Sequence, residues 1–182
     1  MATKTAMTAE EFLVHSTDAP CELVCGEMVE TVWRSVRHGI VCVNVGMILR
    51  TWSRKHSIGF VAVQAGVITQ RDPDSVRCPD CLFIHKERIP GGISSSGFLP
   101  TTPDLAVEVL SEGDRWSEVI AKVGEYLEAG VREVWILNPE LSQVQVFRPD
   151  QPPTIVEAAD ELTSPVVLPS FRCRVSEIFA EM

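Results

Sequence analysis

Two carboxylates and one ammonium are the groups of this 182-residue chain whose types and spacing could do chemistry. Asp80 follows Pro79, Glu108 lies in the apolar run of residues 105–110, and Lys122 follows in a segment with helical spacing. A carboxylate buried without a partner costs about 1–3 kcal/mol or more, so Asp80 and Glu108 are expected to be protonated, paired or bound to a cation. Two carboxylates that converge from neighbouring strands beside an ammonium would form a site for a hard divalent ion and a phosphate.

Glu108 is difficult to place in solvent. In a strand, residues 105, 107 and 109 face one way and residues 106, 108 and 110 the other, and both sets are mostly apolar. An outward-facing glutamate on an edge strand, or an ion pair with an arginine, stays open as an alternative. Asp80 could likewise be an ordinary aspartate at the end of a strand. If the two strands pair antiparallel, however, Asp80 and Glu108 can approach within a few ångströms and bridge Mg²⁺.

Lys122 lies at the margin of the apolar stripe of its helix, from which a long side chain can reach over the edge of a sheet. There its ammonium could position an attacking water or offset charge in the transition state. Because Lys122 also lies four residues after Glu118, an exposed Glu–Lys pair is the plain alternative.

Glu22 and His38 are weaker candidates. Glu22 lies in a predicted hairpin and could add a metal ligand or contact a metal-bound water. His38 lies near the start of a predicted helix, where it could bind a substrate phosphate or be a polar residue near the cap. The sequence contains no phosphate-binding Gly-rich loop, dinucleotide fingerprint, His-Glu-x-x-His motif or Gly-x-Ser-x-Gly elbow.

The net charge of −9 argues against a broad basic surface for nucleic acid, because neutralisation of phosphates dominates such binding. Acidic metal sites add to the negative count, and a local basic patch or a groove between two subunits remains compatible with this charge. The length favours a single domain over residues 1–182, and the 45% hydrophobic fraction is typical of a globular protein.

We expect a cytoplasmic protein that does not enter a membrane. Residues 1–20 contain no long apolar run that would resemble a signal peptide, and no apolar segment approaches about 20 residues. The six cysteines are then expected to be reduced thiols. A zinc site made by Cys21, Cys25, Cys78 and Cys81 remains a minor alternative, since Cys78 and Cys81 have ligand-like spacing.

The hydrophobic pattern predicts an α/β (α+β) domain with a mixed sheet, in which strands outnumber helices but interleave with them. The Thr8–Glu11 capping box and later apolar spacing predict helices. The expected helices cover residues 8–16, 35–55, 114–129 and 175–181. A hairpin is expected over residues 21–31, and residues 86–102 are expected to form a flexible surface loop. The further expected strands are two within residues 57–70 and one each over residues 79–85, 103–110, 131–137 and 143–147.

The chain resembles the Uma-type endonuclease family of the PD-(D/E)XK superfamily over about residues 7–180. The resemblance is carried by the following segments: residues 22–27, His38, Pro79-Asp80, residues 103–111, 122–126, 129–135 and 165–169. It is most specific over residues 103–135. It implies a restriction endonuclease-like core with a mixed central sheet flanked by helices, preceded here by the N-terminal helix and β-hairpin. It also implies a metal held by Asp80 and Glu108, support of that metal by Glu22, and Lys122 as the catalytic lysine.

Two positions depart from the superfamily pattern. Leu110 stands where the simple motif has lysine, and the resemblance implies that Lys122 supplies the ammonium from the following helix. Cys78 stands where a basic residue usually precedes Pro-Asp.

These features lead to two hypotheses. The first is an endonuclease dependent on Mg²⁺ or Mn²⁺ that hydrolyses phosphodiester bonds of DNA and that could act as a homodimer. The second is a nuclease-like fold without catalysis that serves as a binding or regulatory module, which the net charge of −9 favours.

Overall fold

The computed structural model describes residues 6–15 and 19–180. Its elements in chain order are α1 (Ala9–Val14), β1 (Cys21–Val24), β2 (Glu27–Glu30), α2 (Val36–His56), β3 (Gly59–Val63), β4 (Val67–Gln70), β5 (Ser75–Arg77), β6 (Cys81–His85), the 3₁₀ turn η1 (Lys86–Arg88), β7 (Leu105–Val109), α3 (Trp116–Glu128), β8 (Glu133–Asn138), β9 (Gln143–Phe147), β10 (Thr154–Val156), β11 (Glu161–Ser164), β12 (Leu168–Arg174) and α4 (Val175–Ile178).

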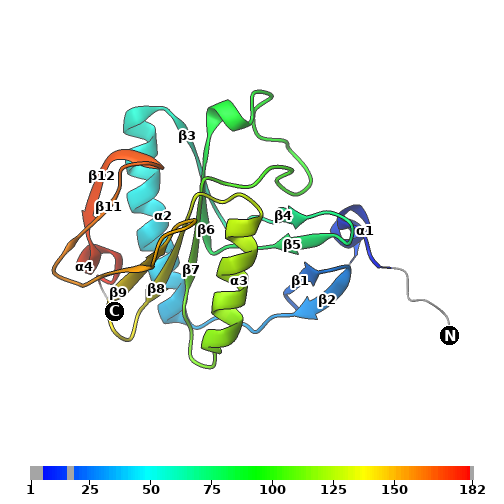
Figure 1. Cartoon of the computed structure of the whole chain (residues 1–182), viewed down its shortest axis with the longest axis horizontal. Helices are drawn as coiled ribbons and strands as arrows, with labels where there is room; N and C mark the ends of the chain where they lie inside the picture. The colour runs from blue at the N-terminus through cyan, green and yellow to red at the C-terminus, as the bar shows by residue number, and fades with distance from the viewer. Residues whose placement is uncertain (1–5, 16–18, 181–182) are drawn as a thin grey trace.

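A six-stranded mixed sheet of order β10-β9-β8-β7-β6-β3 forms the centre of the molecule (Figure 1). Strand β7 pairs antiparallel with β6 and parallel with β8, and α3 connects the parallel pair. Helix α2 covers one face of the sheet together with β11, β12 and α4, and α3 covers the other. This arrangement confirms the predicted fold class of a mixed sheet flanked by helices.

The two long helices follow from their apolar spacing. In α2, Val41, Val45 and Leu49 recur every four residues and are fully buried against the sheet. The Ser35 side chain caps the start of α2 by accepting a hydrogen bond from the backbone N–H of His38. This cap fixes the first turn of α2, and therefore His38, beside the edge of the sheet.

A second, four-stranded sheet of order β2-β1-β5-β4 lies beside the central sheet and is covered by α1 (Figure 1). Helix α1 has the predicted capping box between Thr8 and Glu11. The predicted hairpin is also confirmed as β1 and β2, with residues 25–26 in the turn. Strand β1 carries Glu22, so this small sheet brings one predicted site residue to the central sheet.

Several expected elements differ from those observed. The strand expected from residue 79 begins at Cys81, so Asp80 lies in a bend immediately before β6. Strands β5, β10, β11 and β12 were not predicted, because they are short or, in the pair β11 and β12, interrupted by an irregular register. The first and last helices end earlier than expected, at Val14 and Ile178, and the expected end positions 16 and 181 lie outside the described residues.

The loop over residues 86–102, expected to be a flexible surface loop, is anchored near its end by contacts of Phe98 and Leu99. Leu99 forms a β-bridge with Val67, and the Phe98 ring stacks on Phe12 with 5.8 Å between ring centroids. A Cβ at Gly66 would overlap the Phe98 ring, so this close approach requires glycine. Because glycine and serine dominate the composition of this loop, its sequence did not indicate that Phe98 anchors it.

Candidate active site

Asp80 and Glu108 come together through the antiparallel pairing of β6 and β7. Cys81 pairs with Val107, so the position before β6 faces the next position along β7. The Asp80 Oδ2 atom accepts a hydrogen bond of 2.8 Å from the backbone N–H of Val109. Both acids are buried, with 6% exposure for Asp80 and 8% for Glu108. The condition set by the sequence, antiparallel pairing of these two strands, is therefore met.

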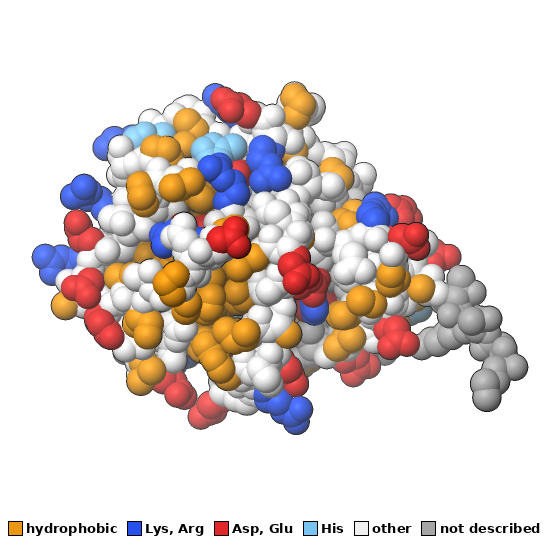
Figure 2. All heavy atoms as spheres, in the orientation of Figure 1, with side chains coloured by type: hydrophobic (Ala, Val, Ile, Leu, Met, Phe, Trp, Pro, Cys, Tyr) orange, Lys and Arg blue, Asp and Glu red, His pale blue; other side chains and the backbone are white. Residues whose placement is uncertain are grey.

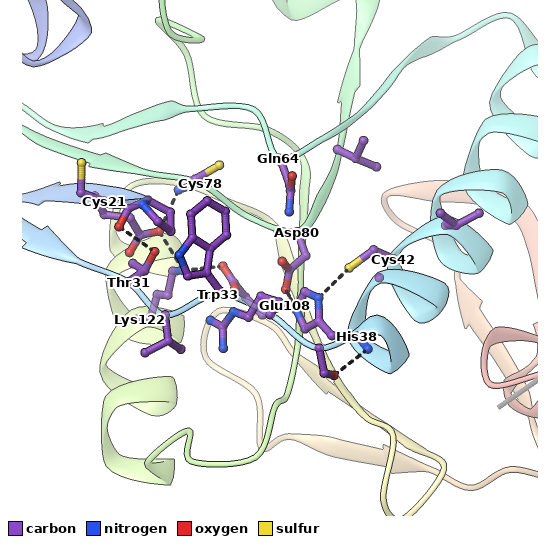
Figure 3. A pocket seen from close by; sticks show the side chains of 18 residues that line it. Cys21, Thr31, Trp33, His38, Cys42, Gln64, Cys78, Asp80, Glu108 and Lys122 are labelled. Atoms are coloured by element: carbon purple, nitrogen blue, oxygen red, sulfur yellow. Dashed lines mark hydrogen bonds and ion pairs between the residues drawn. The ribbon is translucent and has the colours of Figure 1, made fainter. Parts of the chain in front are cut away.

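Lys122 points from α3 toward Glu108, with 2.9 Å between its Nζ atom and Oε1 of Glu108 (Figure 3). The same ammonium lies 2.9 Å from Oε1 of Glu22. The alternative pair with Glu118 is not observed: Lys122 contacts the two buried carboxylates, and Glu118 pairs with Arg115 at the solvent-exposed start of α3. Lys122 is thus held between two carboxylates from two different sheets.

Tyr126 is a site residue that the pattern of acids did not single out. Its hydroxyl donates a hydrogen bond of 2.7 Å to Oε1 of Glu108, and its side chain is fully buried. The available signal was its position four residues after Lys122, which places both side chains on the same face of α3. The hydroxyl and the ammonium together fix the orientation of the Glu108 carboxylate.

In the carboxylates of Asp80 and Glu108, one oxygen contacts other groups of the protein and the other has no such contact among the described residues. Both contacts of Asp80 go to Oδ2, and both contacts of Glu108 go to Oε1. Among the described residues, Oδ1 of Asp80 and Oε2 of Glu108 have no hydrogen-bond partner. Oxygen atoms of this kind are the donors that Mg²⁺ and Mn²⁺ prefer.

Glu22 is engaged by cations and by a backbone N–H. It accepts from Lys122, from the backbone N–H of Cys78 at 2.9 Å and from Arg77 at 3.0 Å. Burial alone would raise the pKa of Glu22, but Lys122, the Cys78 N–H and Arg77 outweigh it, and the pKa is lowered. Arg77 also donates to Glu125 of α3 at 2.8 Å. This geometry places Glu22 as a partner of Lys122.

Burial dominates the electrostatics of Glu108. It raises the pKa of Glu108 to about 7 in spite of the Lys122 ammonium, and the nearby carboxylates of Asp80 and Glu22 act in the same direction as burial. Burial disfavours the Lys122 ammonium too, but Glu108 and Glu22 outweigh it and raise the pKa of Lys122. The pKa of Glu108 and the pKa of Lys122 are thus both raised. One ammonium is shared by two carboxylates, in a site that contains three acidic side chains.

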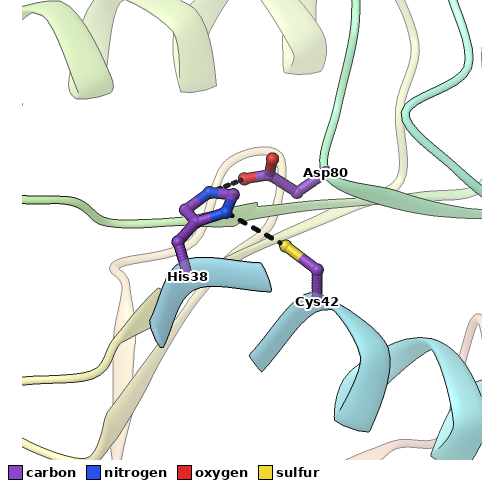
Figure 4. A group of neighbouring side chains, drawn as sticks. All are labelled: His38, Cys42 and Asp80. Atoms are coloured by element: carbon purple, nitrogen blue, oxygen red, sulfur yellow. Dashed lines mark hydrogen bonds and ion pairs between the residues drawn. The ribbon is translucent and has the colours of Figure 1, made fainter. Parts of the chain in front are cut away.

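His38 contacts Asp80 from α2, on the side of the sheet opposite to α3. Its Nε2 atom lies 3.2 Å from Oδ2 of Asp80, and its Nδ1 atom lies 3.4 Å from Sγ of Cys42 (Figure 4). Its side chain is only 2% exposed. With Asp80 as a carboxylate, Nε2 carries the ring proton and Nδ1 accepts from the Cys42 thiol. This geometry favours orientation of Asp80 by His38 over the expected contact with substrate phosphate.

The structure does not bring the four cysteines of the zinc alternative together. Among the described residues, the one close group of three or more His, Cys, Asp or Glu side chains consists of His38, Cys42 and Asp80. Cys25 is exposed in the hairpin turn, whereas Cys81 is buried in the core on the α2 side of the sheet. Glu22 also lies outside that group.

Comparison with known proteins identifies the family. Residues 9–176 match the sequence profile of the family described as "Uma2: putative restriction endonuclease". This chain belongs to the Uma2 family. The Uma2 resemblance of the sequence is thereby confirmed over nearly the whole chain. No curated protein sequence matches it.

A solved structure has the same fold as this Uma2 protein. It is a crystal structure described as "a putative nuclease belonging to DUF820" from Anabaena variabilis ATCC 29413. The TM-score is 0.81 at 19% sequence identity, and the match covers 96% of this chain and 98% of that chain. At this identity the likeness shows the fold alone, and it agrees with the mixed sheet flanked by helices described above.

The positions at which this Uma2 chain departs from the superfamily pattern have local explanations. Leu110 is partly buried against the core under α3, where it packs with apolar side chains. Lys122 supplies an ammonium beside Glu108 from that same helix. Before Pro79, the backbone N–H of Cys78 contacts Glu22, and the neighbouring Arg77 supplies a basic side chain.

The site opens into a cleft of about 650 Å³ (Figure 3). Its lining includes Glu22, His38, Asp80, Glu108 and Lys122. At its rim Trp33 is 81% exposed, in the segment that joins β2 to α2. The cleft is therefore accessible to a ligand from outside.

Charged side chains of both signs are interspersed on the face drawn in Figure 2, which has no continuous basic area. This agrees with the net charge of −9. Near the cleft, Arg34 is partly exposed but pairs with Asp114 at 2.9 Å. Among the described helices, none has the length and apolar character needed to cross a membrane.

Proposed function

We propose that this protein is a Mg²⁺- or Mn²⁺-dependent endonuclease that hydrolyses phosphodiester bonds of DNA, with Asp80 and Glu108 as metal ligands. The observation that carries the proposal is the pair of carboxylates on adjacent antiparallel strands, each with one oxygen held by the protein and one without a partner among the described residues. The all-oxygen character of these two donors fits a hard divalent ion. When bound, such an ion supplies a Lewis acid for the phosphate oxygens.

In this proposal, neighbouring groups of the protein fix the orientation of the two metal-binding carboxylates. The backbone N–H of Val109 and the ring of His38 orient Asp80, and the hydroxyl of Tyr126 orients Glu108. Such contacts keep a ligand carboxylate in one orientation and reduce the reorganisation needed during the reaction. Asp80 and Glu108 are the groups that would touch the ion, and the three others are positioning groups.

Lys122 is proposed as the catalytic lysine. Its ammonium would orient the attacking water and offset the charge that develops on the phosphate as the bond to the bridging oxygen breaks. Glu22 supports this role as a positioning residue, because it lies 2.9 Å from the Lys122 ammonium and would retain that contact if Glu108 turned toward an ion. Glu22 as a supporting metal ligand is the less favoured role, since its oxygens already accept from Lys122, Arg77 and the Cys78 N–H.

Nicking of supercoiled plasmid with added Mg²⁺ or Mn²⁺ tests the proposal. We expect the wild type to nick the plasmid, and the Asp80→Ala/Glu108→Ala variant to lose at least about 100-fold in rate. The matched control is Glu87→Ala/Glu177→Ala, which removes two exposed carboxylates that do not line the cleft. Equal nicking by the wild type and the Asp80/Glu108 variant would refute the proposal.

A binding or regulatory module without catalysis is the second candidate function. The net charge of −9 favours it, because a strongly acidic protein is repelled by nucleic acid. Titration calorimetry separates the two candidates. Binding of Mn²⁺ that is lost in Glu108→Ala supports the enzyme, whereas a folded wild type that binds no divalent ion supports the module.

A further inference from the structure

The group formed by His38, Cys42 and Asp80 contains a donor that a Mg²⁺ site does not use. One ligand atom from each residue lies within 4.8 Å of the others, and all three side chains are buried. The donors are an imidazole nitrogen, a sulfur and a carboxylate oxygen. Mg²⁺ selects oxygen ligands, whereas nitrogen and sulfur together select zinc and similar softer ions.

We propose that His38, Cys42 and Asp80 form a binding site for Zn²⁺, and that this site shares Asp80 with the site proposed for Mg²⁺. The proposed Zn²⁺ site is argued from the three side chains alone. The sharing of Asp80, by which Zn²⁺ would exclude Mg²⁺, rests on the proposed function.

Two of the donor separations are close to those of a zinc tetrahedron, and all three donors lie within 4.8 Å of one another. Bond lengths of about 2.0 Å to nitrogen or oxygen and about 2.3 Å to sulfur give donor separations of roughly 3.3–3.5 Å. The separation from His38 Nε2 to Asp80 Oδ2 is 3.2 Å, and that from His38 Nδ1 to Cys42 Sγ is 3.4 Å (Figure 4). Since these contacts use opposite ring nitrogens, binding requires the imidazole and the thiol to rotate until one nitrogen faces both partners.

The backbone already favours convergence of the three side chains. Cys42 lies one helical turn after His38, so both project from the same face of α2. Asp80 is held against this face by the Val109 N–H. All three residues line the cleft, which gives an ion a route to them and leaves its fourth position open to a water or a phosphate oxygen.

The charges balance when Zn²⁺ enters. The zinc–sulfur bond forms as the Cys42 S–H proton leaves to solvent, and His38 binds as the neutral ring. One thiolate and one carboxylate then offset the two positive charges, so the buried group is neutral overall. Mg²⁺ gains nothing from the sulfur, which makes Cys42 the residue that selects between the ions.

Co²⁺ is the probe for the test, because a cobalt–thiolate bond gives a charge-transfer band in the near ultraviolet. We expect this band in the wild type at one equivalent of Co²⁺, and its removal by added Zn²⁺. Cys42→Ser should lose the band and weaken Zn²⁺ binding by at least about 10- to 100-fold, because loss of an outer-shell partner alone has that effect and Cys42 is a direct ligand. The matched control is Cys173→Ser, because Cys173 is also buried, at 7% exposure against 9% for Cys42.

Two results would overturn the site. One is the absence of the band in the wild type, which needs no variant and does not depend on how a variant folds. The other is persistence of the band in Cys42→Ser, which would assign it to another thiol. Competition by Mg²⁺ tests the shared ligand separately: excess Mg²⁺ should weaken Co²⁺ binding in the wild type and fail to do so in Glu108→Gln. If the band is lost in Cys42→Ser but Mg²⁺ never competes, the zinc site stands and the shared Mg²⁺ site fails.

Discussion

Replacement of Glu108 by glutamine should change how the stability of the protein depends on pH. Burial raises the pKa of Glu108 from 4.5 in the unfolded chain to about 7 in the folded protein. The folded state therefore holds the Glu108 proton more tightly than the unfolded state. This contribution to stability is fully present below pH 4.5 and is lost as the pH rises through 7. The glutamine side chain cannot ionise, so the variant lacks this dependence.

The magnitude follows from the two pKa values. Their difference, at about 1.4 kcal/mol per pH unit, corresponds to about 3 kcal/mol of unfolding free energy lost between pH 4 and pH 8. Glu108 is only 8% exposed, so screening by solvent reduces this figure little. Tyr126 can donate to the carbonyl oxygen of the introduced glutamine, and Lys122 retains Glu22, so the variant keeps most of the surrounding contacts.

Urea unfolding at several pH values between 4 and 8, in the presence of a chelator, measures the effect. The free energy of unfolding of the wild type minus that of Glu108→Gln should fall by about 3 kcal/mol across this range. Other titrating groups are common to both proteins and largely cancel in the difference. Glu118→Gln is the matched control, because it removes an exposed carboxylate from the same helix, α3.

A difference that stays constant within about 0.5 kcal/mol, or that increases with pH, would refute the argument that burial dominates at Glu108. Addition of Mg²⁺ then tests the proposed metal site in the same experiment. At about 100 times its Kd, the ion should stabilise the wild type at pH 8 by about 2.7 kcal/mol and leave Glu108→Gln unchanged.

Three further variants test separate contacts. Tyr126→Phe removes the 2.7 Å hydrogen bond to Glu108 and should cost about 1–3 kcal/mol of unfolding free energy at pH 8; unchanged urea unfolding would contradict this. Lys122→Met should retain Mn²⁺ binding in calorimetry but nick plasmid at least about 100-fold more slowly, and nicking at the wild-type rate would exclude Lys122 from catalysis. Thr8→Ala breaks the capping box of α1 and should cost about 1 kcal/mol in thermal or urea unfolding without a change in nicking; an equal loss of nicking would show that α1 is coupled to the cleft.

Local sequence patterns predicted the elements that carry the site. The alternation in residues 105–110 placed Glu108 on the face opposite to Val107, and β7 confirms it, since Val107 lies in the α2-side core and Ala106 lies under α3. Helical spacing predicted α2 and α3 to within two residues at their ends. These predictions succeed because side-chain periodicity depends only on neighbours along the chain.

Short elements and long-range partners could not be predicted in this way. Strands of three or four residues such as β5 and β10 carry too little alternation to stand out. The pairing of Lys122 with Glu22 joins residues 100 positions apart and depends on how the small sheet packs beside the central one. The local rule instead indicated Glu118, four residues before Lys122.

The sequence by itself determined the chemical groups of the candidate site and the face of the strand or helix from which each one projects. Only the tertiary structure decided which of them meet. The antiparallel register of β6 and β7 brings Asp80 to Glu108, and α2 and α3 approach this edge from opposite faces with His38 and Lys122. Register and helix packing are set by burial of the whole core, and no local spacing contains that information.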